Sequence, residues 1–459
     1  MTQPRYVAVI DIGKTNAKLA LVDLASLKEV AVVTRSNDVL PGPPWPHYDL
    51  DGHWAFLLDN LAAFHRDHGI DAISATTHGA SMVLLDERGH LAAPMIDYEF
   101  DGPDSLDAAF QAIRPPFSET GTPRQHRGLS VGAQIHYMFH QDPELAARTA
   151  SLVTYPQYWG FRLTGVQSTE LTSLGCHTDL WRPYEARPSS LAEHLGVAGK
   201  LAPVRAASEV LGPILPEIAQ RTGLPADTPV FVGIHDSNAS LLPYLLAREA
   251  PFSVVSTGTW VVALSVGGEP KDLGTFPDTV INHNALGQPL PSVRLMGGRE
   301  YEIAMHGARV EPTDADIRAV LESGVMLLPA LVPDAGPLQG RTARWEGGEP
   351  DAGSGICAAA TAFYLALVTG FALEIVGHRG RVFVEGPFAH NAAFLDMLAA
   401  ATASPVEAAA SATGTAQGAA LLAAGEAHPP GLGATAEERG DPGADWRRYA
   451  EEWRRIIEV

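Results

Sequence analysis

The sequence predicts an α/β protein made of two similar domains, and three observations support this. Strand-like runs alternate with helix-like runs along most of the chain, which is the pattern of α/β folds. The chain has 459 residues, too many for one hydrophobic core, so two or three domains are expected. A strand, a short polar turn with a glycine and a second strand occur at residues 6–23 and again at 252–266. This repeat predicts an internal duplication, in which two α/β domains face each other with a ligand between them.

The first hairpin, "YVAVIDIGKTNAKLALVD" at residues 6–23, has a turn suited to phosphate. It is not a Walker phosphate loop, which needs a glycine five residues before Gly13 and a helix after Thr15. Position 8 is Ala8, and a strand-like run follows the turn. Backbone N–H groups, short polar side chains and a cation nevertheless gather in one turn; the residues are Asp11, Gly13, Lys14, Thr15 and Asn16. An ordinary surface hairpin is the alternative, because Asn and Gly are common turn residues, and this stretch alone leaves both open.

The rest of the first half continues the alternation. An amphipathic helix is predicted at 54–69. Residues 70–91 are predicted to form a strand, a polar turn and a hairpin, and residues 100–130 a loop region with short helices. A buried strand at 228–236 ends in the carboxylate of Asp236, and a helix follows it. Pro243 lies inside that helix and should kink or break it, because proline has no N–H and clashes with the preceding turn.

The second half repeats this order after the hairpin at 252–266, whose turn is Thr257-Gly258-Thr259. A helix is predicted at 358–376 and a strand at 381–386. A turn at 387–391 then leads into a helix at 392–402, and a further helix is predicted at 414–427. Gly386 and Asn391 bracket that turn, where N–H groups and an amide side chain can contact a ligand. Helix capping is the simpler interpretation of Asn391 taken alone.

Composition excludes several classes of protein. The net charge of −21 argues against a nucleic-acid partner, whose binding needs basic patches. The two cysteines, Cys176 and Cys357, form no metal motif and no disulfide framework, which fits a reducing cytoplasm. The N-terminal residues show no charged segment followed by an apolar secretory core, so a cytoplasmic protein is expected.

Two apolar helices need separate interpretation. Residues 358–376 carry one charge, Glu374, and are long enough to cross a bilayer. A helix buried between a sheet and its neighbours gives the same pattern, and this interpretation is preferred. In the tail, one helical face is apolar: Trp446, Tyr449, Trp453 and Ile456. We expect this face to dock onto the body of the protein; a homodimer contact is the alternative.

The order of these pieces resembles the FGGY carbohydrate kinases, which belong to the actin and hexokinase superfamily. The matching motifs span nearly the whole chain: "DIGKTNAKL" from Asp11, "TTHGAS" from Thr76, "YPQYWGFRLTG" at 155–165, "GIHDSNAS" at 233–240, "STGTW" at 256–260 and "VEGPFAHN" at 384–391. The resemblance implies two ribonuclease-H-like domains that face each other across an active-site cleft. Residues 1–246 would hold the sugar and the catalytic base, and residues 247–459 would bind ATP and carry the C-terminal helix.

Asp236 is the predicted catalytic base. It follows a buried strand and precedes a helix, so its carboxylate lies at the carboxyl edge of a sheet, where α/β proteins bind ligands. A carboxylate there can take the proton of a sugar hydroxyl, which is a poor nucleophile at pH 7. A helix N-cap is the alternative role for Asp236; the phosphate-type hairpins on either side of it favour the base.

The resemblance assigns the ATP phosphates and Mg²⁺ to both hairpins. Lys14 or Lys18 and the two turns would supply the positive charge and N–H donors that phosphoryl transfer needs; Lys14 stands where the family commonly has Thr. Mg²⁺ would arrive with ATP and contact Asp11 through water. Further ATP contacts are predicted in "MGGREYE" at 296–302 and in the adenosine turn, where one glycine remains of the family's glycine run: Gly298, Gly386, Pro387 and Asn391.

Sugar hydroxyls need polar partners, and these are predicted in the first half. The predicted substrate-binding residues are His78, Gly79, Asp97, Glu99, Tyr158 and Asp236. Tyr158 and its neighbour Trp159 would stack on a sugar face or fill the core. "HDSNAS" and "STGTW" are closest to the rhamnulose and fuculose kinase branch of the family.

The sequence therefore predicts an ATP-dependent kinase of a ketose of the L-fuculose or L-rhamnulose type. Kinases of another ketose or polyol, such as xylulose, ribulose, erythritol or glycerol, are alternatives. An actin-fold nucleotide-binding sensor without transfer is the alternative of another class, and the shortened glycine run supports it. A dinucleotide-dependent oxidoreductase is excluded, because the first strand leads into "IGKTNA", which lacks the G-x-G-x-x-G turn.

Overall fold

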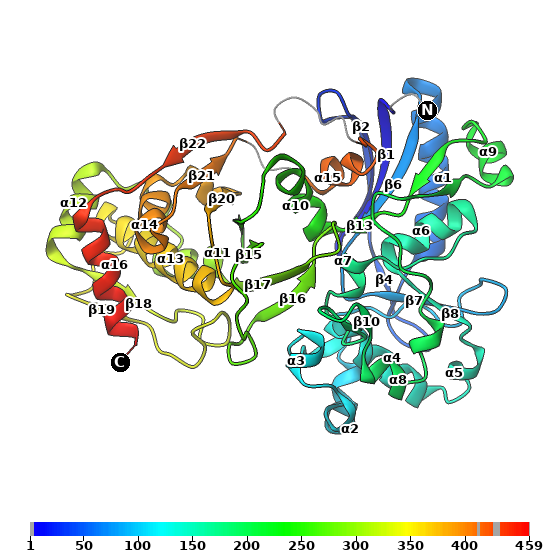
Figure 1. Cartoon of the computed structure of the whole chain (residues 1–459), viewed down its shortest axis with the longest axis horizontal. Helices are drawn as coiled ribbons and strands as arrows, with labels where there is room; N and C mark the ends of the chain where they lie inside the picture. The colour runs from blue at the N-terminus through cyan, green and yellow to red at the C-terminus, as the bar shows by residue number, and fades with distance from the viewer. Residues whose placement is uncertain (1–3, 411–413, 426–431, 459) are drawn as a thin grey trace. The chain divides into compact units, whose positions relative to one another are not determined.

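The computed structural model describes residues 4–410, 414–425 and 432–458, which form two compact units (Figure 1). The first unit comprises the chain up to Ala247, residues 281–289 and the segment around helix α15 (Thr415–Leu421). The second unit begins at Arg248 and contains the remaining described residues. Each unit is built on one seven-stranded sheet.

The sheet of the first unit is centred on the predicted hairpin. Its strand order is β11 (Val210–Pro213), β12 (Pro229–Phe231), β6 (Ala72–Thr77), β1 (Tyr6–Ile12), β2 (Asn16–Asp23) and β3 (Lys28–Ser36). A further short strand, β13 (Ile234–His235), pairs with β6. β1 pairs antiparallel with β2 and parallel with β6.

The sheet of the second unit is centred on the second predicted hairpin. Its strand order is β16 (Thr279–His283), β17 (Pro289–Leu295), β15 (Val261–Val266), β14 (Phe252–Thr257), β20 (Arg381–Glu385), β21 (Val406–Ala409) and β22 (Thr435–Arg439). β14 pairs antiparallel with β15 and parallel with β20. In both sheets the first hairpin strand therefore pairs antiparallel with the second hairpin strand on one side and parallel with a strand from later in the chain on the other. This shared order confirms the predicted duplication.

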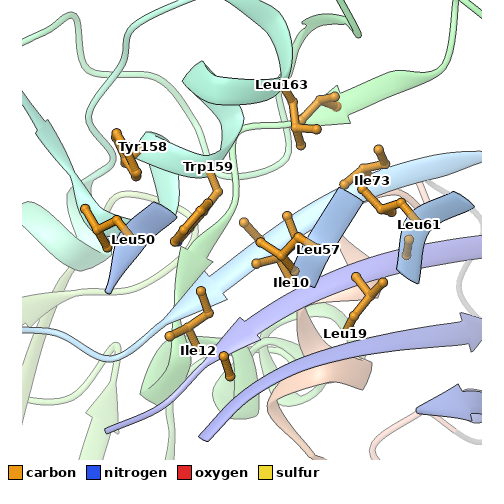
Figure 2. Packing of buried hydrophobic residues seen from close by; sticks show 14 of the residues in the cluster. Ile10, Ile12, Leu19, Leu50, Leu57, Leu61, Ile73, Tyr158, Trp159 and Leu163 are labelled. Carbon is orange, nitrogen blue, oxygen red and sulfur yellow. The ribbon is translucent and has the colours of Figure 1, made fainter. Parts of the chain in front are cut away.

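Helices cover both faces of the first sheet (Figure 1). The helices of this unit are α1 (Leu50–His68), α2 (Asp107–Ile113), α3 (Phe117–Thr120), α4 (Val131–Gln141), α5 (Leu145–Arg148), α6 (Tyr155–Thr164), α7 (Leu171–Leu174), α8 (Ser190–His194), α9 (Pro216–Thr222), α10 (Asp236–Ala247) and α15. Alternate residues of a strand point to opposite faces. Ile10 and Ile12 therefore pack against α1 and α6 with Leu57, Trp159 and Leu163 (Figure 2), and Asp11 points to the face that α15 covers.

Helix α1 begins four residues earlier than predicted. Asp49 is its N-cap, and its carboxylate accepts a hydrogen bond from Gly52 N at 2.9 Å. The short elements at 100–130 form as predicted. The predicted hairpin turn at residues 86–89 forms, because Asp86 N donates to His90 O at 2.8 Å and an antiparallel bridge joins Leu85 to Leu91. β7 (Met82–Leu85) pairs in addition with β8 (Ser151–Thr154).

The predicted buried strand at 228–236 is interrupted at Gly233. This residue has φ +89°, and a Cβ there would lie 2.5 Å from the carbonyl oxygen of Ala75 in β6. Only glycine fits this combination of positive φ and close approach. The interruption separates β12 from β13, and β13 ends directly before Asp236.

Of the kink or break predicted at Pro243, the break is wrong, because α10 continues from Asp236 to Ala247. A proline at this position removes the hydrogen bond to the carbonyl oxygen of Ala239. Gly418 of α15 lies against that oxygen, which would be 1.8 Å from a Cβ at Gly418. The close contact with α15 covers the carbonyl that Pro243 leaves without an intrahelical partner.

The remaining small sheets are β4 (Val39–Leu40) with β5 (His47–Tyr48), β9 (Trp181–Arg182) with β10 (Arg187–Pro188), and β18 (Met326–Leu328) with β19 (Arg344–Glu346). The helices of the second unit are α11 (Gly297–Ala304), α12 (Asp314–Ser323), α13 (Gly355–Ile375), α14 (Ala392–Thr402) and α16 (Ala444–Ile457). Among the described residues, α13 is the one helix long and apolar enough to cross a membrane, but 89% of its most apolar window is buried within the fold. It is a core helix, as preferred from the sequence. Residues 426–427 of the predicted 414–427 helix lie outside the described residues.

The C-terminal helix α16 docks onto the second unit, as predicted. Trp453 is 1% exposed, and its Nε1–H donates to Leu327 O at 3.0 Å. The hydroxyl of Tyr449 donates to Val325 O at 2.6 Å. Ile457, not the predicted Ile456, is the buried isoleucine of the last turn. The homodimer contact stays a prediction.

We expect Trp453→Ala to lower the free energy of unfolding of the second unit by about 3–5 kcal/mol, the usual cost of removing a buried Trp side chain. Denaturant titration followed by circular dichroism measures this change. Arg448→Ala is the matched control on the same helix, because the Arg448 side chain is 68% exposed and its loss should change stability by less than about 0.5 kcal/mol. Equal effects of the two substitutions would contradict the docking of α16.

Candidate active site

Three parallel strands of the first unit end at the same edge of its sheet. The register places Ile12 of β1 beside Thr77 of β6, and Thr77 beside His235 of β13. His78 follows β6, and its backbone N–H donates to Ile12 O at 2.9 Å. Asp236 follows β13 as the first residue of α10. Polar residues near the ends of three adjacent strands thus come together at the carboxyl edge, the usual ligand site of α/β proteins.

Asp236 is held through one of its two carboxylate oxygens. Oδ1 accepts from Ser237 N at 2.5 Å and from Ser237 Oγ at 3.2 Å, and it lies 3.1 Å from His235 Nε2. The side chain is 29% exposed. An N-cap side chain accepts from the second or third amide of the helix, whereas Asp236 accepts from the amide of the next residue. This geometry does not support the capping alternative.

The neighbours of His235 leave little room beside Asp236. A Cβ on Gly79 would lie 2.7 Å from His235 Nε2 and 3.2 Å from Cys176 Sγ, so a larger residue at position 79 would push His235 away. Burial lowers the pKa of His235, which keeps its imidazole neutral at pH 7. Gly79, predicted as a substrate-binding residue, thus provides space for the residue that contacts the candidate base.

A buried carboxyl group supports the strand that carries Asp236. Thr172 Oγ1 accepts from His235 N at 3.0 Å and donates to Glu170 Oε2 at 2.5 Å. Glu170 is 2% exposed, and burial raises its pKa to about 7 despite hydrogen bonds from Thr172 and Ser173. Glu170 therefore fixes Thr172, and Thr172 fixes the backbone beside Asp236.

Asp11 lies near the end of β1 and is 9% exposed. Its Oδ2 lies 2.9 Å from Lys18 Nζ and accepts from Thr415 Oγ1 at 2.6 Å. Lys18 also contacts Glu29 at 3.2 Å. Burial opposes the charged form of Lys18, but the two acids raise its pKa overall. Lys18 therefore stays charged beside the first turn.

Hydrogen bonds from Asn37 hold the turn between β1 and β2 in place. Asn37 Nδ2 donates to Gly13 O at 2.8 Å, and Asn37 N donates to Thr15 O at 2.9 Å. His53 Nε2 lies 2.7 Å from Asn37 Oδ1, and burial lowers the pKa of His53 to about 4. Thr15 and Asn16 are exposed on the turn, as a phosphate-binding role requires.

Lys14 leaves this turn and points to another group of residues. Its Nζ contacts the Asp97 carboxylate, lies 3.3 Å from Glu99 Oε2 and donates to Tyr48 Oη at 3.4 Å. It also lies 5.0–5.1 Å from the centres of the Tyr48 and Tyr98 rings. We call Lys14, Tyr48, His78, Asp97, Tyr98 and Glu99 the Lys14 cluster. Asp97 and Glu99 are thus brought together with Lys14, whose predicted phosphate role the contacts do not support.

His78 joins the Lys14 cluster through its ring. The ring centre lies 5.2 Å from Tyr48, 5.0 Å from Tyr98 and 5.1 Å from Tyr155. His78 is 6% exposed, and its Nε2 has no hydrogen-bond partner among the described residues. Burial lowers the pKa of His78 to about 4, although the charge of Asp236 acts in the opposite direction. Burial raises the pKa of Tyr98, and the negative charges of Glu99, Asp236 and Asp97 raise it further. Asp236 therefore acts electrostatically on the Lys14 cluster.

Tyr158 is not a surface for sugar stacking, which corrects its assignment as a substrate-binding residue. It is 2% exposed and packs in the core with Trp159 (Figure 2). Its hydroxyl accepts from Arg162 at 2.7 Å. Both aromatic residues follow the apolar spacing of α6, so they fill the space between this helix and the sheet.

In the second unit, Thr257 ties the hairpin to the adenosine turn. Its hydroxyl donates to Glu385 O at 2.5 Å and accepts from Phe388 N at 3.0 Å, so it is engaged within the protein. Gly258 and Thr259 form the accessible part of the turn. The backbone of this turn, rather than the Thr257 hydroxyl, is therefore available to a phosphate.

Two predicted glycines lie directly against this hairpin. A Cβ on Gly386 would lie 2.0 Å from Thr257 O, and one on Gly298 would lie 2.3 Å from Gly258 O. Gly386 also has φ +82°. Pro387 begins the short 3₁₀ helix η4 (Pro387–His390). Asn391 caps α14 by accepting from Phe394 N at 3.0 Å, which is the capping role that the sequence favoured over ligand contact.

Six residues of these sites were not singled out from the sequence. Tyr48, Glu170 and Thr172 lie in no recognised motif, and Tyr155 begins the motif at 155–165 without being assigned a role. Thr415 contacts Asp11 across 404 positions, which only the tertiary fold reveals. Asn37 was missed because a lone asparagine after a strand indicates a turn and nothing more.

The fold has two duplicated sheets and a polar edge on the first, and comparison with known proteins identifies the class as carbohydrate kinases. Residues 6–243 match the N-terminal domain of the FGGY family of carbohydrate kinases, and residues 249–430 match the FGGY C-terminal domain. The chain belongs to the FGGY family. The predicted family and two-domain fold are confirmed.

Individual relatives agree with this placement. The chain is similar to the crystal structure of a carbohydrate kinase from Novosphingobium aromaticivorans, with 33% identity over 99% of each chain and a TM-score of 0.89. It is 24% identical over 277 residues to an L-fuculokinase of Salmonella typhi, covering 57% of each protein. It is 32% identical over 290 residues to a probable L-xylulose kinase of Pasteurella multocida, covering 59% of this chain and 58% of that protein. The chain thus aligns with less than two thirds of the length of these two curated relatives.

Glu170→Gln should change the pH dependence of stability. The folded protein holds the Glu170 proton up to about pH 7, whereas an unfolded chain releases it near pH 4.5. The contribution of protonated Glu170 to stability is therefore present below pH 4.5 and is lost as the pH rises to about 7. Relative to the variant, the wild type should lose about 3 kcal/mol of unfolding free energy between pH 4.5 and 8.

Urea titration at four pH values measures this difference. Glu193→Gln is the control, because Glu193 is exposed in the same unit, and its difference from the wild type should stay constant with pH. A constant difference for Glu170→Gln as well would show that Glu170 is ionised throughout.

Proposed function

We propose that the protein is an ATP-dependent sugar kinase that transfers the γ-phosphoryl group to a hydroxyl of a ketose. The observation that carries this proposal is the position of Asp236 at the carboxyl edge of the first sheet, beside His78 and the Lys14 cluster. The family supports the same conclusion, because FGGY carbohydrate kinases use ATP.

Asp236 acts as the general base. Its Oδ1 is held by Ser237 and His235, so Oδ2 is the oxygen that we assign to the substrate proton. As that proton moves to Oδ2, the sugar oxygen forms a bond to the γ-phosphorus, and the bond from this phosphorus to the bridging oxygen of ADP breaks. Such base catalysis contributes roughly a hundred- to ten-thousand-fold to the rate.

The phosphates are assigned to the backbone of the two turns. Residues 13–16 are held rigidly by Asn37 in the first unit, and Gly258 and Thr259 are accessible in the second. Lys18, adjacent to the first turn, supplies a positive charge. Pre-positioned N–H groups and cations stabilise the charge that spreads over the phosphoryl oxygens in the transition state.

Mg²⁺ is proposed to enter with ATP, with Asp11 as its carboxylate contact through water. The residues fit a loosely held ion: Asp11 is a single carboxylate whose Oδ2 already contacts Lys18, and no group of three or more His, Cys, Asp or Glu among the described residues could hold a metal. Mg²⁺ with few protein ligands and several waters is common at ATP sites. When bound, it neutralises charge on the β- and γ-phosphate oxygens.

A ketose of the L-fuculose or L-rhamnulose type is the proposed acceptor. The support is the fuculokinase relative and the "HDSNAS" and "STGTW" motifs; the xylulose kinase relative makes L-xylulose the next choice. Coupled ADP release with Mg-ATP against L-fuculose, L-rhamnulose, L-xylulose, D-xylulose, D-ribulose, erythritol and glycerol tests the proposal. Sugar-dependent release on one or two ketoses would support it. ATP binding with no release on any sugar would instead favour the sensor.

Asp236→Asn should bind ATP as the wild type does and lose roughly a hundred- to ten-thousand-fold in kcat, because the amide cannot accept the proton. Steady-state kinetics and nucleotide titration calorimetry measure the two quantities. Asp227→Asn makes the same charge change at an exposed site of the same unit and should leave kcat unchanged. Near-normal turnover of Asp236→Asn would remove Asp236 from the mechanism.

A further inference from the structure

The Lys14 cluster contains a lysine whose charge is already matched inside the protein. Lys14 Nζ contacts Asp97, lies 3.3 Å from Glu99 and lies between the rings of Tyr48 and Tyr98. The Lys14 and Asp97 side chains are only 20% and 10% exposed. Tyr48 Oη donates to the same Asp97 oxygen at 2.9 Å. These contacts direct the Lys14 ammonium at Asp97 and Glu99.

The charges around the cluster sum to a negative value. Lys14 contributes one positive charge, while Asp97, Glu99 and the neighbouring Asp236 contribute three negative charges, which leaves −2. His78 adds no positive charge at neutral pH, since burial lowers its pKa to about 4. The side of the site that faces the candidate base is therefore acidic although it contains a lysine.

We propose that the Lys14 cluster selects an uncharged sugar and rejects sugar acids of the same size. The proposal rests on the kinase function proposed above and deepens it by naming the class of sugars that the site excludes. Lys14 then acts as a specificity-determining residue on the acceptor side, in contrast to the phosphate role that its place in "DIGKTNAKL" implies.

The polar groups of the cluster suit hydroxyl groups. His78 Nε2 is buried and has no partner among the described residues, so a hydroxyl could satisfy it. The Glu99 side chain is 54% exposed, and its carboxylate can accept from a hydroxyl. A carboxylate on the ligand offers no donor to Glu99, Asp97 or Asp236, and it is repelled by all three. Like charges brought together in a partly buried site oppose binding strongly.

The first test compares each active ketose with an aldonate of the same carbon number and the same configuration from C3 onward. The quantity compared is kcat/KM, measured from ADP release. We expect the ketose to be preferred by about a hundredfold or more. Comparable kcat/KM values for the two would overturn the inference and leave the kinase function intact. If neither the ketoses nor the aldonates support ADP release, the proposed function fails, and the inference fails with it.

The second test changes the charge of the cluster. Glu99→Gln removes one negative charge at an exposed side chain and should reduce the preference for the ketose about three- to tenfold. Glu87→Gln makes the same change in the exposed turn after β7 and should leave the preference as in the wild type. An unchanged preference in Glu99→Gln would overturn the inference.

Lys14→Met separates the two roles of the lysine. If Lys14 acts on the acceptor side, its loss should raise KM for the ketose about tenfold and leave KM for ATP unchanged. It should also increase the discrimination against the aldonate. A raised KM for ATP with an unchanged KM for the ketose would return Lys14 to the phosphates and overturn the inference. Circular dichroism confirms that the variant is folded before kinetics are compared.

Discussion

The close approach of Gly233 to β6 is the constraint on which the candidate active site depends. The backbone at Gly233 passes so near the carbonyl of Ala75 that no Cβ fits, and its positive φ ends β12 and allows β13 to begin in a new register. That register places His235 beside Thr77. Asp236 therefore leaves the sheet beside His78, at the edge where β1 also ends. Gln157 reinforces the same bend, because its Nε2 donates to Val232 O and Gly233 O at 3.0 and 3.1 Å.

Much of the fold could be predicted because it depends on local patterns. The two hairpins, α13, β20 and α14 follow from hydrophobic periodicity and turn residues, and the duplicated strand order follows from the repeat. The errors occur where tertiary contacts override local rules. Pro243 stays helical because α15 covers the freed carbonyl of Ala239, and β7 pairs with β8, a partner far along the chain that its own sequence does not indicate.

The candidate site was predictable to a similar extent. The positions of Asp236, Asp11 and His78 at one edge of the sheet could be predicted, because each lies at or just beyond the end of a strand and the ends of parallel strands share one edge. The residues that hold these side chains in place could not be predicted. Glu170 reaches Asp236 only through Thr172 and His235, and Lys14 turns toward Asp97 because Tyr48 and Tyr98 enclose it. Nothing in the spacing of these residues distinguishes Lys14 directed at a phosphate from Lys14 directed at a carboxylate.

The contact between Asp11 and Thr415 has a consequence for the order in which the chain folds during synthesis. Helix α15 packs on β1, β6 and α10, so the first unit contains a helix translated some four hundred residues after its first strand. Closing a loop of this length carries an entropic cost and requires contacts of very high sequence separation. All strands of the second sheet except β22 precede α15 in the chain, so most of that sheet can form on the ribosome while the first sheet still lacks one of its covering helices. The first unit, although it begins the chain, can be completed only after nearly the whole chain has been made.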